Sequence, residues 1–142
     1  MMSLNQSVGI NAPTDVVFAY VTEPATMAEW IPPMVQTRDI VGSGEGQQFE
    51  WTYKLAGLLF RGQSVVVEHV PNEVSVYQSI GAISSTWTFR VASHDSGAKF
   101  TVDIAYDVPV PVLGKLAERV IVSRDSRNLD SALANVKEIL EA

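Results

Sequence analysis

Residues 97–141 read GAKFTVDIAYDVPVPVLGKLAERVIVSRDSRNLDSALANVKEILE, and the spacing of their apolar residues changes around Pro109 and Pro111. Apolar and polar residues alternate over positions 100–106, which predicts a β-strand with one buried face. After the prolines, apolar residues recur at intervals of three or four over positions 113–141, which predicts one long helix. A strand that leads directly into a long helix predicts an α+β fold.

The strand pattern extends upstream of this stretch, over positions 34–107. It is clearest over positions 48–55, where aromatic residues alternate with polar ones. Short turn sequences, such as the Pro-Asn pair at 71–72, separate successive strands, which predicts an antiparallel meander. With a further strand over positions 4–10, the sheet has about seven strands, and Gly62 inside one of them marks a candidate bulge or bend.

Helices are predicted before and after this meander in the sequence. Two short helices follow the first strand, between positions 13 and 30, and the Pro-Pro pair at 32–33 ends the second. A sheet with one apolar face must bury that face against another element, and the long C-terminal helix is the only predicted element large enough to do so. Its apolar residues form two arcs, over 113–121 and 129–140, that differ by roughly 145° about the helix axis. Either the helix bends or breaks in the polar stretch 123–128, or it buries different faces along its length.

The composition excludes several classes of site. The chain has no cysteine, so disulfides, thiolate metal ligands and cysteine nucleophiles are excluded. Its two histidines, His69 and His94, cannot form a three-histidine zinc site, and we expect neither a metal nor a cofactor. The 10 basic and 16 acidic side chains give a net charge of −6, which argues against binding to nucleic acid.

The chain is rich in apolar residues and poor in charge. Hydrophobic residues make up 46% and charged residues 18%, against about 25% charged residues in typical globular chains. No segment approaches the length of about 18 consecutive apolar residues that a membrane span needs, and residues 1–6 lack a basic patch followed by an apolar stretch, so we expect no secretory signal. We therefore expect a cytoplasmic protein without stable membrane insertion, organised as one domain over residues 1–142. The apolar excess must face a core, an internal cavity or a partner.

Several short motifs resemble those of one known superfamily. Ile10-Asn11-Ala12-Pro13 precedes Val16-Val17-Phe18, Glu23-Pro24 precedes Trp30 and Pro32, and residues 66–71 read VVEHVP. Together with residues 120–141, these motifs resemble the START-like superfamily of the SRPBCC type, which includes Bet v 1-like allergens, polyketide cyclases and dehydrases, and lipid-transport domains. The resemblance implies a helix-grip fold, in which a curved antiparallel sheet wraps around a long C-terminal helix with a hydrophobic cavity between them. It also implies lipids, polyketides, sterols or aromatic molecules as ligands, and catalysis in a minority of members.

The candidate ligand-binding residues lie on the dry face of the sheet and on the helix that covers it. For the aromatic residues, ordinary core packing and cavity lining both stay open. For Arg124, Arg127 and Asn128, the alternatives are a solvated helix face and contact with a ligand carboxylate or carbonyl, which the planar guanidinium of arginine suits. The full candidate set is Trp51, Tyr53, Trp87, Phe89, Tyr106, Val120, Arg124 and Asn128.

A large empty cavity would be costly for a chain of this size. Ligand pockets measure about 300–1,000 Å³, and an empty void of that volume costs about 7–24 kcal/mol at roughly 24 cal/mol per Å³. The net stability of a domain is only about 5–15 kcal/mol. We therefore expect a cavity that is partly hydrated, narrowed by the helix or occupied.

Binding or transport of a small hydrophobic molecule is the function that we expect. The first alternative is an enzyme of the polyketide cyclase or dehydratase kind, for which Tyr53, Tyr106, His69 and Arg124 are the available acids and bases. No spacing marks a catalytic set among them. The second alternative is an interaction module or homodimer, in which the apolar stretch 27–34 forms a surface patch or a lid over the cavity.

Overall fold

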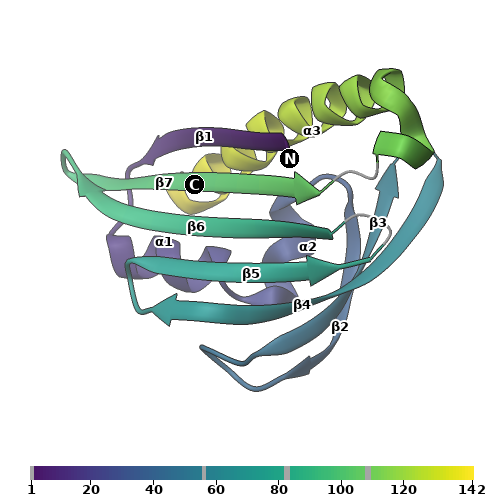
Figure 1. Cartoon of the computed structure of the whole chain (residues 1–142). Helices are drawn as coiled ribbons and strands as arrows, with labels where there is room; N and C mark the ends of the chain where they lie inside the picture. Colours follow the sequence, from purple (N-terminus) through teal and green to yellow (C-terminus); the bar gives the residue numbers. More distant parts are fainter. Residues whose placement is uncertain (1, 56, 82–83, 108–109) are drawn as a thin grey trace.

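The computed structural model describes residues 2–55, 57–81, 84–107 and 110–142, with their side chains except at positions 2, 55, 107 and 110–122. The α+β order expected from the sequence is confirmed (Figure 1). β1 (Met2–Ile10) leads into α1 (Thr14–Val21), the 3-10 turn η1 (Pro24–Thr26) and α2 (Met27–Trp30). The elements that follow are β2 (Met34–Val41), β3 (Gln48–Leu55), β4 (Leu58–Val70), β5 (Val74–Ile80), β6 (Ser84–His94), β7 (Gly97–Asp107) and α3 (Val110–Glu141).

The seven strands form one antiparallel sheet in the order β1-β7-β6-β5-β4-β3-β2. Each strand from β2 to β7 pairs with the next, as expected of a meander, and β1 pairs with β7. Figure 1 shows β3 and β4 sweeping up toward the green end of α3, so that the sheet curves around the helix. This architecture is the helix-grip fold that the resemblance implies.

Gly62 lies where two parts of the structure approach closely. The β3–β4 register is unbroken at this position, where Gly62 pairs with Trp51, and β4 shifts its register further along, between Val66 and Glu68. Of the bulge or bend expected at Gly62, the bulge is therefore not found there. A Cβ atom at Gly62 would lie 2.2 Å from Cζ2 of the Trp51 ring, so a glycine is needed to leave room for the indole.

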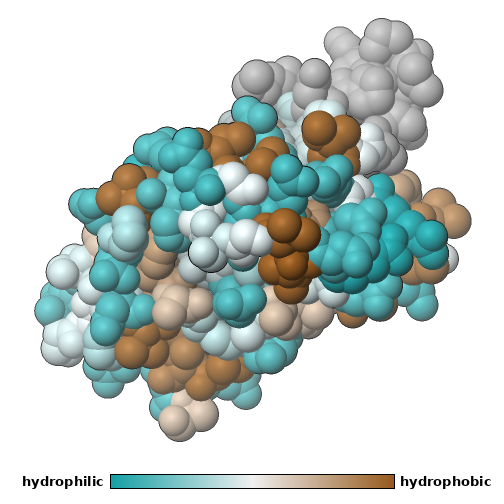
Figure 2. Space-filling model, turned by 90° about the horizontal axis from the view of Figure 1, so that it is seen from below, coloured by the Kyte–Doolittle hydropathy of each residue, from teal (hydrophilic) through white to brown (hydrophobic). Residues whose placement is uncertain are grey.

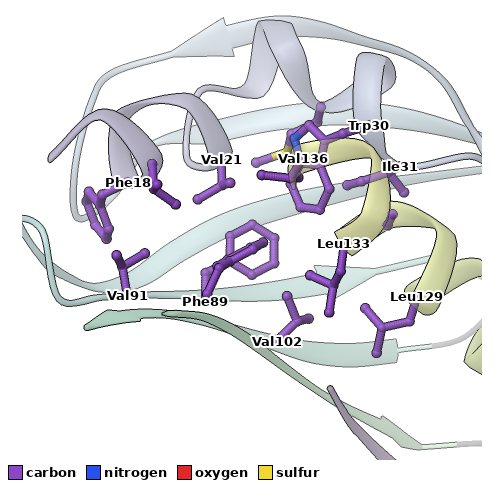
Figure 3. Packing of buried hydrophobic residues seen from close by; sticks show 14 of the residues in the cluster. Phe18, Val21, Trp30, Ile31, Phe89, Val91, Val102, Leu129, Leu133 and Val136 are labelled. Carbon is purple, nitrogen blue, oxygen red and sulfur yellow. The ribbon is translucent and has the colours of Figure 1, made fainter. Parts of the chain in front are cut away.

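Aromatic rings form the centre of the hydrophobic core. Phe89 of β6 lies with its ring centroid 5.6 Å from that of Trp30 in α2 and 5.5 Å from that of Phe100 in β7 (Figure 3). The Asn135 side chain of α3 donates a hydrogen bond to the Trp30 carbonyl over 3.2 Å. The short helix α2 is therefore held against both the sheet and α3.

α3 is helical without interruption from Val110 to Glu141, so the break considered near 123–128 is not found. Its buried residues Leu129, Leu133 and Val136 pack toward the sheet (Figure 3). The last turns are tied to the end of β1, because Lys137 Nζ donates to the carbonyl of Gly9 over 3.1 Å. Among the described residues, no helix is long and apolar enough to cross a membrane.

Candidate functional site

A cavity of about 20 Å³ lies between the sheet and α3. Among the residues that the structure describes, its wall is aromatic and aliphatic on most sides, with one carboxyl group and one amide. The residues that line it are Trp30, Ile31, Pro33, Tyr53, Trp87, Ile104, Tyr106, Asp125, Asn128, Leu129 and Ala132. The helix-grip fold thus places residues from α2, β3, β6, β7 and α3 around one interior space.

The cavity is far smaller than a pocket that encloses a whole ligand. A volume of about 20 Å³ is room for one water-sized group, whereas ligand pockets measure about 300–1,000 Å³. Trp30 is 1% exposed and Leu129 is 5% exposed, so large side chains from both helices fill the space that the curved sheet encloses. At roughly 24 cal/mol per Å³, a void of this size costs only about 0.5 kcal/mol. In its described part, the cavity is therefore narrow enough that leaving it empty costs the fold little.

The polar centre of the cavity is a pair formed by Tyr106 and Asp125. The Tyr106 hydroxyl donates a hydrogen bond to Oδ2 of Asp125 over 2.5 Å. Burial raises the pKa of the Asp125 carboxyl, and the hydrogen bond from Tyr106 opposes that shift only in part. Burial, and after it the nearby Asp125 charge, also holds the pKa of both Tyr53 and Tyr106 well above the usual tyrosine range. The two phenols stay neutral and can serve as hydrogen-bond donors.

Asp125 is the functional candidate that sequence reasoning missed. It lies four residues before Leu129 and seven before Ala132, so the three side chains share one face of α3. The expectation that Arg124 faces the cavity followed from extending the first apolar arc of the helix. In the structure, the face formed by the second arc continues toward the N-terminus of the helix, and Arg124 and Arg127 are exposed. Counting back by four from Leu129 would have identified Asp125.

Four of the eight sequence-predicted residues lie together on the cavity wall: Tyr53, Trp87, Tyr106 and Asn128. Trp51 lies beside the wall, with its ring centroid 4.9 Å from that of Tyr53 and its Nε1 donating to Ser64 Oγ over 3.0 Å. Trp87 Nε1 likewise donates to Ser85 Oγ over 3.0 Å. Both indole N–H groups thus have partners within the sheet, which fixes the two ring planes.

The other predicted residues are placed differently. Phe89 is 2% exposed and belongs to the aromatic core next to Trp30, where ordinary core packing accounts for it. The side chain of Val120 lies outside the described residues. Within the part of the chain that the structure describes, no group of three potential ligands could hold a metal ion.

The fold is shared with solved bacterial structures. The TTHA0849 protein of Thermus thermophilus superposes with a TM-score of 0.84 at 15% identity, covering 96% of this chain and 95% of that one. The Zhui aromatase/cyclase from Streptomyces sp. R1128 superposes with a TM-score of 0.80 at 18% identity, covering 99% and 93%. The di-domain aromatase/cyclase BexL of the BE-7585A biosynthetic pathway gives 0.75 at 23% identity, covering 99% of this chain and 50% of BexL. At these identities the likeness shows the fold alone.

The sequence itself matches a family. No curated protein matches the chain closely enough to define a relative. The family described as polyketide cyclase / dehydrase and lipid transport, by contrast, matches residues 1–141, almost the full length. Its match agrees with the sequence motifs and with the helix grip around an aromatic cavity, and the chain therefore belongs to the polyketide cyclase / dehydrase and lipid transport family.

Proposed function

We propose that this protein binds a small hydrophobic molecule between its sheet and α3. The observation that carries the proposal is the composition of the cavity wall, in which the described aromatic and aliphatic side chains surround a few polar groups, those of Tyr106, Asp125 and Asn128 among them. Such a wall is typical of ligand sites, where apolar surface supplies affinity and a few polar atoms fix orientation. The family match and the helix-grip fold support the same function.

A ligand larger than one water-sized group needs more room than about 20 Å³. Binding therefore involves repacking of side chains on the wall or a shift of α3 relative to the sheet. We expect the ligand to stabilise the fold, because a molecule that binds only the folded state raises the melting temperature by mass action.

The experiment combines native mass spectrometry of the purified protein with a thermal-shift panel of fatty acids, sterols and aromatic compounds. Ala132→Leu fills the cavity, since Ala132 lines it and is 3% exposed. Ala134→Leu is the matched control, because Ala134 is exposed on the same helix. A retained ligand or a melting shift that Ala132→Leu abolishes and Ala134→Leu preserves supports the proposal. A blank result in both measurements refutes it.

A cyclase or dehydratase is the second candidate, and Asp125 is the observation that favours it. Burial raises the pKa of the Asp125 carboxyl, which favours its acid form, and a carboxylic acid at this position would donate its proton to a carbonyl or hydroxyl oxygen of a bound polyketide. The aromatase/cyclase names of Zhui and BexL point to the same chemistry. Incubation with a linear poly-β-ketone, followed by mass spectrometry, tests it. Asp125→Asn should abolish cyclised or dehydrated products, and Asp130→Asn, on the exposed face of α3, should not.

An interaction module or a homodimer stays a prediction with weaker support, because the stretch 27–34 expected to form its surface patch is mostly buried, with Met27, Trp30 and Met34 only 3%, 1% and 6% exposed. Large exposed apolar residues include Val41, Leu59 and Ile80, at 67%, 59% and 67% exposure. Figure 2 shows brown hydrophobic residues in separate groups among hydrophilic ones on the face seen from below, rather than in one continuous patch. Size-exclusion chromatography with light scattering tests this alternative directly.

A further inference from the structure

The described part of the cavity wall has an acidic group but no basic one. Asp125 contributes a carboxyl group, and the wall, in its described part, holds no lysine, arginine or histidine. Arg124, the cation nearest in sequence, is exposed. A partly buried carboxylate with no cation among its described neighbours is unfavourable, and a ligand that brings a positive charge would relieve that cost.

The uncharged part of the wall also suits a cation. Four aromatic rings line the cavity, those of Trp30, Tyr53, Trp87 and Tyr106. The faces of such rings carry partial negative charge and attract ammonium groups. Tyr53 and Trp87 lie with ring centroids 6.4 Å apart and planes at 80°, so their rings meet nearly at right angles at one corner of the cavity.

The volume restricts the kind of cation. Before any repacking, about 20 Å³ accommodates one water-sized group, which is the size of a primary ammonium head, and only the apolar body of the ligand needs the wall to repack. A metal ion would need several ligating side chains, and the described residues provide no cluster of three. A carboxylate head, as in a fatty acid, would face the like charge of Asp125.

We propose that the hydrophobic ligand of this cavity carries an ammonium group and that the Asp125 carboxylate is its counter-ion. The aromatic side chains of Trp30, Tyr53, Trp87 and Tyr106 would surround the ammonium group. Tyr106 positions the carboxylate by donating to Oδ2, and Oδ1 accepts from the ammonium group. The inference rests on the proposed function and names the ligand class for the same site: an apolar, aromatic or aliphatic body with a basic amine.

The test compares three probes that share one body: 2-phenylethylamine, 2-phenylethanol and phenylacetate at pH 7. Binding is followed by isothermal titration calorimetry and by tryptophan fluorescence, because two of the three tryptophans, Trp30 and Trp87, line the cavity. We expect the amine to bind at least about tenfold more tightly than the alcohol, and phenylacetate to bind more weakly than either.

Two isosteric variants distinguish binding to the Asp125 carboxylate from the general effect of removing one negative charge. Asp125→Asn should reduce the affinity for the amine to that for the alcohol, whereas Asp130→Asn, which removes the same charge from the exposed face of α3, should leave the tenfold preference intact. An equal loss in both variants overturns the inference.

The result also distinguishes this inference from the proposed function. If the alcohol or phenylacetate binds as tightly as the amine, and Ala132→Leu blocks that binding, the cavity binds ligands but the ammonium inference is wrong. If none of the three probes binds and the purified protein carries no ligand, the proposed function fails and this inference fails with it.

Discussion

Replacing Gly62 with alanine should destabilise the fold, because the new methyl group has no space. Its Cβ would lie 2.2 Å and 2.5 Å from two ring atoms of Trp51 and 2.6 Å from the backbone oxygen of Ile80. The oxygen belongs to the β4–β5 ladder and cannot move alone. The Trp51 ring must therefore shift, which breaks its hydrogen bond to Ser64 Oγ.

The expected magnitude follows from these two losses. Overpacking of a well-packed site costs about 1–3 kcal/mol, and the lost hydrogen bond adds about 0.5–1.5 kcal/mol. For a chain of 142 residues, a loss of about 2–4 kcal/mol lowers the melting temperature by roughly 6–15 °C. Because Trp51 lies against Tyr53 on the cavity wall, the tryptophan fluorescence of the native state should change as well.

Thermal unfolding followed by circular dichroism measures this loss, with Gly9→Ala as the control. A Cβ at Gly9 meets only the His94 ring, at an ordinary contact distance of 3.7 Å. That variant should therefore melt within about 2 °C of the wild type. Equal stability of the two variants would refute the argument that the indole of Trp51 requires a glycine at position 62.

Three further predictions concern the core, the cavity carboxyl and the surface. Phe89→Ala, at a residue 2% exposed, should cost about 3–5 kcal/mol and lower the urea midpoint. Burial raises the pKa of Asp125, so its protonation stabilises the folded state. This contribution is fully present below the unfolded-state pKa of about 3.9 and is lost as the pH rises through the higher pKa of the folded state. The melting temperature of Asp125→Asn should therefore rise relative to that of the wild type as pH increases above about 4 and then level off, and a pH-independent difference would contradict this. Lys137→Ala removes an exposed ion pair with Glu141 and the hydrogen bond to the Gly9 carbonyl, so the urea midpoint should stay close to that of the wild type, and a clearly lower midpoint would show that these contacts fix α3.

The strands could be predicted because burial on one face leaves a period of two in the sequence. The alternation over positions 48–55 coincides with β3, and that over 100–106 lies within β7. Chain order then determines the pairing from β2 to β7, since short turns favour pairing of successive strands, but it does not determine the pairing of β1 with β7. Tyr53 and Tyr106 could be assigned to the inner face for the same reason, although they lie in strands far apart in the sequence.

The polar residues of the helix were harder to place, because each residue turns the helical face by about 100°. Extending the first apolar arc of α3 points Arg124 toward the sheet, and extending the second points Asp125 there. The two choices give opposite charges for the cavity and therefore opposite classes of ligand. Leu129 and Val136, which pack on the sheet, decide between them.

The volume of the cavity could not be predicted, because it depends on how side chains from separate elements fill one space. The 46% hydrophobic content suggested an enclosed apolar space, and Trp30 of α2 is buried in that interior, with 1% of its surface exposed. The ring centroid of Trp30 lies 5.6 Å from that of Phe89 and 5.8 Å from that of Phe100, so one residue from a four-residue helix joins the two layers of the core. The apolar excess is thus mostly packed core, and what remains is a space of about 20 Å³. In so small a space we expect the carboxyl group of Asp125, the one carboxyl among the described lining residues, to decide which ligand head group can enter, more than the apolar area does.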